Sequence, residues 1–142
     1  FDMLRALDIS TSGLVAQRIR LDAISGNLAN MSSVRNERGE LQPYQERFVV
    51  FQPDEEVRSR DGAVGVKVSE VRTETVEPKY RYQPGHPLAI KEGKWKGYVA
   101  YPNMDMMSQF VDSLIATRAY EANLGVMEVT KNLSDQSLRI IG

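Results

Sequence analysis

The distribution of proline constrains this sequence more than any other single feature. All six prolines fall between residues 43 and 102, so the first forty and the last forty residues contain none. Proline inside a helix removes a backbone hydrogen bond and clashes with the preceding turn. An uninterrupted helix is therefore possible at each end. We expect three regions: residues 1–33 as an N-terminal helix, residues 34–102 as a small β-rich middle, and residues 103–142 as a C-terminal helix.

A repeat of seven residues supports the N-terminal helix. It consists of Leu7, Leu14, Leu21 and Leu28, with Ile24 at an accompanying position. This spacing predicts an apolar seam of about 28 residues along one side of a helix. Gly13 interrupts the pattern at a cost of about 1 kcal/mol relative to alanine, so the helix is not expected to be stable in isolation.

The C-terminal region carries a longer apolar stripe. Pro102 followed by Asn103 predicts a helix start, because the asparagine side chain can accept hydrogen bonds from the free amides of the first turn. A helix from there to about residue 140 would be about 57 Å long. The apolar residues that we expect at an interface recur at helical spacing and are Met107, Val111, Leu114, Ile115, Ala122, Val126, Val129 and Leu133.

Spacing alone leaves two packings of these stripes open. The two helices could pair within one chain as a coiled-coil-like hairpin, or neighbouring subunits could complete their seams. About half of the chain is expected to be long amphipathic helix, and the middle region is too small to cover it. This proportion favours neighbouring subunits.

The middle region combines strand-like patterns with turn residues. Residues 48–51 are a short β-favouring run, Asp61-Gly62 is typical of a turn, and valines alternate with other residues over 64–68. Tyrosines alternate over 79–82, and residues 98–101 form a last run. We predict a small antiparallel β unit. The fold class is therefore mainly α with a small β insertion.

Composition argues against several function classes. The chain has 18 Lys+Arg and 19 Asp+Glu, a net charge of −1, which argues against nucleic acid as a partner. It has no cysteine and a single histidine, so we expect no metal site, no cofactor, no small-molecule substrate and no catalytic residue. We also expect neither a membrane span nor a signal peptide in these residues.

Two polar features receive structural interpretations. Asp54-Glu55-Glu56 follows Pro53 in a loop-like stretch and is expected to be a solvated charge run rather than a catalytic or metal-binding group. His86 has no accompanying nucleophile motif, and we expect it to pack in a turn.

Short motifs resemble one known family. Asn27-Leu28-Ala29-Asn30, within residues 22–30, resembles the N-terminal signature of the rod and hook family of bacterial flagellar axial proteins. Further matching positions are Gly85, His86 and Pro87, then Gly97, Tyr98, Pro102 and Asn103, and finally Tyr120 and Asn123. Residues 88–96 depart from the family pattern, because they are longer and more basic than its usual turn.

The resemblance implies a structural role. A chain of this length and motif order is similar to a proximal rod subunit. Such a subunit would be exported unfolded through the flagellar type III export apparatus and would assemble with itself and other rod proteins into a helical tube in the periplasm. The tube would transmit motor torque and enclose the export channel. The alternatives are another axial protein, such as a neighbouring rod subunit or a hook component, or a soluble helical-hairpin interaction module.

Overall fold

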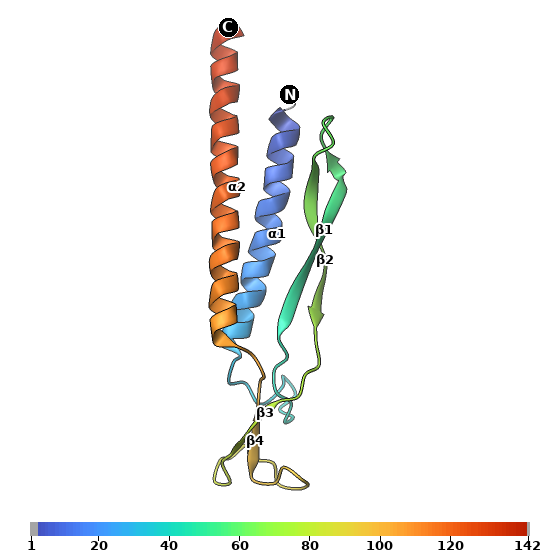
Figure 1. Cartoon of the computed structure of the whole chain (residues 1–142), viewed down its shortest axis with the longest axis vertical. Helices are drawn as coiled ribbons and strands as arrows, with labels where there is room; N and C mark the ends of the chain where they lie inside the picture. Colours follow the sequence, from blue (N-terminus) through green and yellow to red (C-terminus); the bar gives the residue numbers. More distant parts are fainter. Residues whose placement is uncertain (1–2, 142) are drawn as a thin grey trace.

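The chain folds into two long helices joined by two small antiparallel sheets. The structure is a computed structural model that describes residues 3–141. In chain order, the elements are α1 (Met3–Ala29), β1 (Arg47–Arg58), β2 (Val64–Thr73), β3 (Lys79–Tyr82), β4 (Tyr98–Tyr101) and α2 (Met106–Ile141). The molecule is elongated: the helices and the β1–β2 hairpin lie along its long axis, and β3–β4 lies at one end (Figure 1). The expected mainly helical fold with a small β insertion is confirmed.

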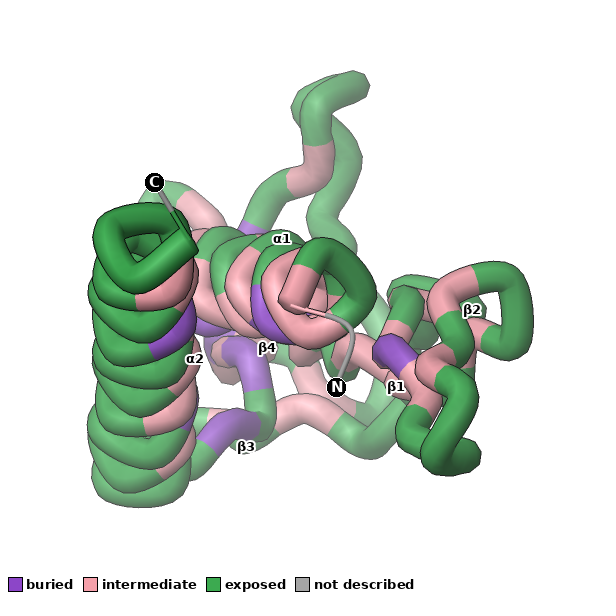
Figure 2. The backbone as a smooth tube through the Cα atoms, turned by 90° about the horizontal axis from the view of Figure 1, so that it is seen from above, coloured by how far each residue is buried: buried purple, intermediate pink, exposed green. Residues whose placement is uncertain are grey.

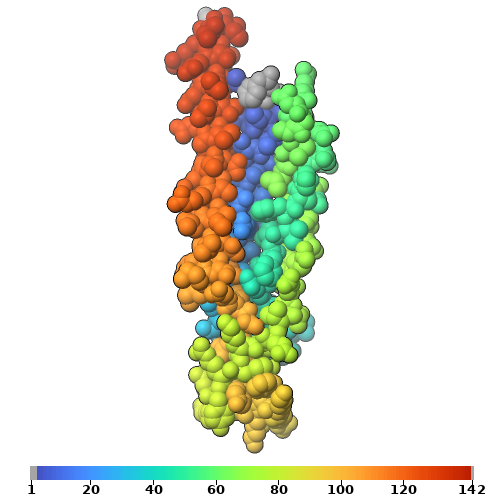
Figure 3. Space-filling model, in the orientation of Figure 1, coloured from blue at the N-terminus to red at the C-terminus, as the bar shows by residue number. Residues whose placement is uncertain are grey.

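The two helices run antiparallel as a hairpin, with the start of α1 and the end of α2 toward the same end of the molecule (Figure 1). Near the middle of the pair, Gly13 of α1 lies against Asn123 of α2. Farther along, the guanidinium of Arg20 lies 3.8 Å from the carboxylate of Asp112. The C-terminal end of α2 projects beyond the start of α1 (Figures 1 and 3). Pairing within one chain is therefore part of the fold.

Helix α1 is the middle layer of three. It contacts α2 on one side and the β1–β2 hairpin on the other, as the view along the long axis shows (Figure 2). Ser12 ties the hairpin to the helix, because its hydroxyl accepts a hydrogen bond from the backbone N–H of Val66 at 3.0 Å. A Cβ at the neighbouring Gly65 would lie 2.7 Å from the same hydroxyl oxygen. Glycine at this position therefore lets strand and helix approach closely.

The start of α2 differs from the prediction. The helix begins at Met106, and its first turn is capped by Asp105 instead of Asn103. The Asp105 carboxylate accepts hydrogen bonds from the backbone N–H of Met107 at 3.1 Å and from the Ser108 hydroxyl at 3.0 Å. The Asn103 side chain donates instead to the backbone carbonyl of Glu77 at 3.0 Å. The carboxylate nearest the free amides therefore acts as the N-cap.

The predicted β1–β2 strands and their turn are present. Arg47 pairs with Thr73 at one end and Arg58 with Val64 at the other, and Gly62 in the turn has a φ of 87°. The expectation of a loop at Asp54-Glu55-Glu56 is wrong, because β1 continues through these residues to Arg58. The ladder is irregular there, because the register shifts between Asp54 and Arg58.

The expected β3 and β4 runs pair with each other and cover a small core. Lys79 lies opposite Tyr101 and Tyr82 opposite Tyr98. The core consists of the buried residues Val34, Ala89 and Val99, with Leu88 and Tyr101 packed against them. In the loop before β4, Trp95 stacks on Tyr80 with ring centres 4.0 Å apart. The histidine of the preceding turn is part of this packing, because the Nδ1 atom of His86 accepts a hydrogen bond from the backbone N–H of Leu88.

Candidate functional site

The seam between the two helices consists of small and polar residues. The residues of α1 that face α2 directly precede the predicted leucines and include Gly13, Arg20 and Asn27. Opposite them lies a heptad of α2 composed of Gln109, Ala116, Asn123 and Thr130, of which all but the half-buried Asn123 are buried. Gly13 permits this approach, since a Cβ there would lie 2.8 Å from the Asn123 amide nitrogen. The hairpin therefore closes through short side chains.

The leucine repeat lies beside this seam. One residue along an α-helix corresponds to a rotation of about 100°. The four residues Leu7, Leu14, Leu21 and Leu28 are half-buried, and Ile24 is buried. The periodicity thus identified the helix and its length. The residues that contact α2, however, are those directly before the leucines: Gly13, Arg20 and Asn27.

Asn27 joins three segments of the chain. Its amide nitrogen donates to the backbone carbonyl of Arg47 at 3.0 Å and to the Gln109 side chain at 3.1 Å. Its amide oxygen accepts from the backbone N–H of Arg47 at 2.9 Å and from the Tyr44 hydroxyl at 3.2 Å. The side chain is 1% exposed, and both of its polar atoms are satisfied. The first residue of the family motif therefore fixes α1 to α2 and to the start of β1.

Gln109 extends the same cluster to a carboxylate. Its side-chain N–H donates to Glu46, one residue before β1. Burial raises the pKa of Glu46 above its ordinary value of 4.5, the hydrogen bond from Gln109 lowers it, and the charges of Asp112 and Glu74 raise it. We call Asn27, Tyr44, Glu46, Arg47 and Gln109 the amide cluster. Sequence reasoning named Asn27 only as a motif residue, and the sequence shows no sign of its distant partner Gln109.

The rest of the first motif ends α1. The Asn30 side chain donates to the backbone carbonyl of Gly26 at 2.8 Å and accepts from the Ser33 hydroxyl at 2.9 Å. Leu28 is half-buried and Ala29 is exposed. Both asparagines of the motif therefore stabilise backbone geometry and are not arranged for catalysis.

The remaining motif residues lie in turns, at the start of β4 or on α2. Gly97 has a φ of 83°, a conformation that glycine adopts readily. Its carbonyl accepts from the backbone N–H of Gln83 at 2.9 Å. The other motif positions are exposed at Gly85, Pro87 and Asn103, half-buried at His86, Tyr98, Tyr120 and Asn123, and buried at Pro102.

The predicted interface residues of α2 face away from the hairpin. Met107 is 67% exposed, Leu114 54% and Val129 58%. We call the following set the outer stripe: Met107, Val111, Leu114, Ile115, Ala122, Val126, Val129 and Leu133, all of which are exposed. Helical spacing places these side chains on one side of α2, and Figure 2 shows how much of this helix is exposed. A continuous apolar surface of this kind is typical of an interaction site.

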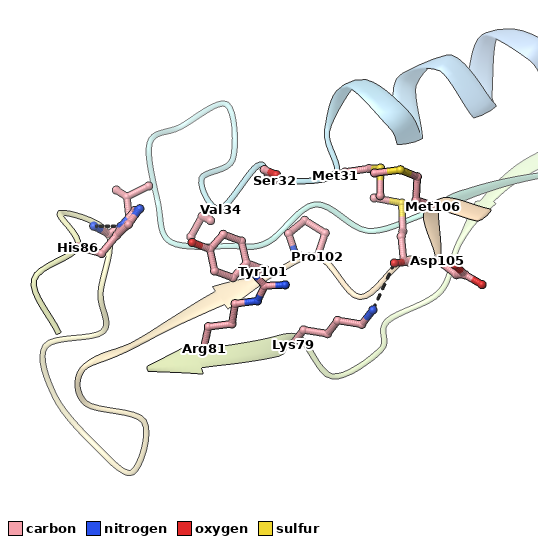
Figure 4. A pocket seen from close by; sticks show the side chains of 12 residues that line it. Met31, Ser32, Val34, Lys79, Arg81, His86, Tyr101, Pro102, Asp105 and Met106 are labelled. Carbon is pink, nitrogen blue, oxygen red and sulfur yellow. Dashed lines mark hydrogen bonds between the residues drawn. The ribbon is translucent and has the colours of Figure 1, made fainter. Parts of the chain in front are cut away.

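A groove lies where α1 ends and α2 begins. We call this cavity of about 660 Å³ the end groove (Figure 4). Its lining residues are Met31, Ser32, Val34, Lys79, Arg81, His86, Leu88, Tyr101, Pro102, Met104, Asp105 and Met106. The ammonium of Lys79 donates to the backbone carbonyl of Met104 at 3.4 Å. The guanidinium of Arg81 lies 5.6 Å from the centre of the Tyr101 ring. The lining therefore combines apolar side chains with the cations of Lys79 and Arg81 and the carboxylate of Asp105.

The side-chain chemistry of the described residues is typical of a protein with a structural role. Between residues 3 and 141, no group of three or more His, Cys, Asp or Glu side chains is placed to hold a metal ion. None of the helices in that range is long and apolar enough to cross a membrane. The exposed Glu55 and Glu56 belong to a strand edge, where Glu55 pairs with Arg58 at 3.5 Å.

The chain is similar to known proteins in its N-terminal and C-terminal parts and over nearly its whole length. Residues 7–35 match the family described as "Flagella basal body rod protein", and residues 96–140 match "Flagellar basal body rod FlgEFG protein C-terminal". Flagellar basal-body rod protein FlgC of Borreliella burgdorferi is 33% identical over 98% of this chain and 97% of its own length. The corresponding figures are 39%, 97% and 97% for FlgC of Escherichia coli O157:H7, and 36%, 95% and 95% for FlgC of Bacillus subtilis.

Proposed function

We propose an assembly surface for this chain, which belongs to the FlgC family of flagellar basal-body rod proteins. The chain is a structural subunit of the proximal rod in the flagellar basal body, and it is not an enzyme. As a rod protein it assembles with other rod components. The proposal is that the outer stripe of α2 packs against the terminal helices of neighbouring subunits.

The exposure of the outer stripe carries this proposal. The α1–α2 seam uses a different side of α2, so forming the hairpin leaves Leu114 and Val129 more than half exposed. Complete burial of one such side chain contributes about 1.5–3 kcal/mol, and the stripe has eight positions. A neighbouring helix packed along α2 would remove this surface from water. The half-buried Leu7, Leu14, Leu21 and Leu28 would complete the contact from α1, whereas Ile24, which the sequence also suggested, is already buried within the subunit.

The proposal also assigns parts of the chain to layers of the rod. The terminal segments 1–33 and 103–142 would form the close-packed inner layer, and residues 34–102 would contact neighbours farther out. Close packing of the helices would transmit torque and leave a central channel. The flagellar type III export apparatus is a further proposed partner. The lack of cysteine supports this, because no disulfide would oppose unfolding before export.

A matched pair of aspartate substitutions tests the surface. Ile115 lies in the outer stripe, and Thr117, also exposed, lies nearly on the opposite side of α2 because two residues rotate a helix by about 200°. Ile115→Asp would place an unpaired carboxylate at the proposed contact, whereas Thr117→Asp would leave it in water. Each variant is produced in cells that lack the parent chain, and rods are isolated and analysed for the protein.

We expect Ile115→Asp to accumulate as folded protein, to be missing from rods and to abolish motility. Thr117→Asp should enter rods as the parent does. Circular dichroism and urea unfolding of the purified chains should place both variants within about 0.5 kcal/mol of the parent, since both positions are exposed in the monomer. Rods that contain Ile115→Asp at the parental level would contradict the proposal.

A further inference from the structure

The end of the molecule opposite the start of α1 and the end of α2 is strongly basic (Figure 1). Residues 79–98 run from β3 to the first residue of β4, and they contain five Lys or Arg and one Glu, a net charge of +4. The rest of the chain has thirteen basic and eighteen acidic residues, a net charge of −5. We call the following exposed cations the basic end: Lys79, Arg81, Lys91, Lys94 and Lys96. No ion pair joins any of them to another residue between 3 and 141.

Three of these cations lie on a short hairpin with a defined backbone. The backbone N–H of Ile90 donates to the carbonyl of Tyr98, and the N–H of Gly97 donates to the carbonyl of Ile90, both at 2.9 Å. Gly93 has a φ of 95° in the turn between them. The hairpin contains most of residues 88–96, the segment that departs from the family pattern. Its backbone presents the lysines in a fixed arrangement, which lowers the entropy cost of binding a partner.

Four aromatic rings lie together on one face of the β3–β4 sheet. Trp95 stacks on Tyr80 with ring centres 4.0 Å apart, and Tyr98 makes edge-to-face contacts with Trp95 at 5.2 Å and with Tyr82 at 5.1 Å. The ammonium of Lys94 lies 5.3 Å from the centre of the Trp95 ring. Tyr82 is 65% exposed, so one ring of the cluster is open to a partner. Tyrosine and tryptophan are enriched at the centres of protein–protein interfaces.

The placement of the cations argues against a small anion as the ligand. Lys79 and Arg81 alternate with Tyr80 and Tyr82 along β3, so these two cations lie on the face of the sheet away from the aromatic rings. Lys94 lies on the aromatic face. Cations on both faces do not converge on one point, but an extended acidic chain that passes over this end can meet several of them.

The apolar side chains of the same segment argue against a lipid surface. Apart from proline, the aliphatic side chains of residues 79–98 are Leu88, Ala89 and Ile90, of which Ala89 is buried and the other two are half-buried. Stable binding to a bilayer surface combines charge with apolar side chains that enter the headgroup region. Rod proteins assemble with other rod components, so protein neighbours are available to this chain. The basic end therefore fits an acidic polypeptide.

We propose that the basic end binds an acidic segment of another protein of the flagellar basal body. The Tyr82 ring packs against that segment, and Lys91 and Lys96 pair with its carboxylates. Opposite charges on the two surfaces favour this neighbour over basic ones and speed the encounter. The inference rests on the proposed function, because it names the chemistry of one contact made by residues 34–102. The contact lies outside the helices and uses none of the outer stripe.

The experiment is photocrosslinking in assembled rods. Benzoylphenylalanine, a photoreactive residue, replaces Tyr82 in cells that lack the parent chain, and the cells are irradiated before rods are isolated. The crosslinked peptide is then sequenced. We expect a segment of a different basal-body protein with a net negative charge. Lys94 is a second position for the photoreactive residue if the change at Tyr82 disturbs the fold.

Charge reversal tests the role of the cations. In the photoreactive chain, Lys91→Glu with Lys96→Glu should lower the crosslink yield per assembled chain by about fivefold or more. The control is Arg60→Glu with Lys67→Glu, which changes the net charge equally at two exposed positions outside the basic end and should leave the yield within about twofold. If the reversed chain does not enter rods, Lys91→Gln with Lys96→Gln replaces it, and a loss of about twofold or more is expected.

Several outcomes would overturn the proposal. They are a crosslink to a second copy of this chain, to lipid or to a segment without net negative charge, the absence of any crosslink in rods that contain the chain, and an equal loss of yield in the control. In each case the chain is present in rods, so the proposed function stands. Its own failure is recognised separately, by Ile115→Asp chains that enter rods.

Discussion

The two faces of α2 reverse the usual relation between apolarity and burial. The inner face meets α1 through Gln109, Ala116 and Thr130, all buried, whereas the outer face exposes Leu114 and Val129. In a self-contained helical hairpin, the apolar stripe would lie between the helices. Here the hairpin is held by close approach and by amide hydrogen bonds, and the apolar side chains remain outside. The inner face thus defines the shape of the subunit, and the outer face remains available for other subunits.

The largest expected effect tests the inner face through a substitution in the amide cluster. Asn27→Leu removes four hydrogen bonds and leaves the Gln109 side chain and the Tyr44 hydroxyl without their partner. Unsatisfied groups of this kind cost about 1–3 kcal/mol each, and we expect the free energy of unfolding to fall by about 3 kcal/mol. The measurement is urea unfolding of the purified chain.

The comparison variant is Leu114→Ala on the outer face. Because Leu114 is 54% exposed, we expect a change in the free energy of unfolding within about 0.5 kcal/mol. If Leu114→Ala destabilised the purified chain as much as Asn27→Leu does, the outer stripe would be part of the subunit's own core.

The close approach of the helices at Gly13 contributes less to the free energy of unfolding. A double-mutant cycle can isolate this contribution. Gly13→Ala places a methyl group 2.8 Å from the Asn123 amide nitrogen, and we expect a loss of about 1 kcal/mol despite the better helix propensity of alanine. In a chain that already carries Asn123→Ala, the same change should increase stability by about 1 kcal/mol, because the obstacle is gone. The same loss in both backgrounds would show that Asn123 does not limit the approach.

The smallest expected effect is the pH dependence contributed by Glu46. Its pKa is raised in the folded chain, chiefly by burial, so the folded state binds this proton more tightly than the unfolded state. The stability it contributes is fully present below the ordinary pKa of 4.5 and is lost as the pH rises through the folded value. Glu46→Gln keeps an acceptor for Gln109 and cannot ionise. The variant should gain stability relative to the parent as the pH increases from 4 to 7, and parallel unfolding curves across that range would contradict this.

The architecture followed from sequence features that act over short distances. The confinement of proline to residues 43–102 left both ends free to form helices, and alternation identified β2 and β3. Two local expectations were wrong, one at the start of α2 and one in β1. Asp105 offered a charged cap closer to the free amides than Asn103, and an irregular ladder let β1 pass through Asp54 and its acidic neighbours.

The inner seam was not predictable by the same reasoning. Apolar periodicity draws attention to leucine and valine, but the residues between the helices are glycine, alanine, threonine and amides. Their value lies in the partner across the seam, as when Gly13 accommodates Asn123, and partners distant in the sequence leave no local pattern. The resemblance of Asn27 and Asn123 to family positions marked them as important without giving the contact.

The amide cluster also gives the folding chain an order of events. The bonds from Asn27 to Arg47 span 20 residues, whereas its bond to Gln109 spans 82. Closing the longer loop costs about 1.2 kcal/mol more chain entropy. Helix α1 and the start of β1 therefore meet first, and one amide hydrogen of Asn27 remains available until α2 arrives. Helix α2 then finds its register marked by this free amide hydrogen, which Gln109 accepts as the hairpin closes.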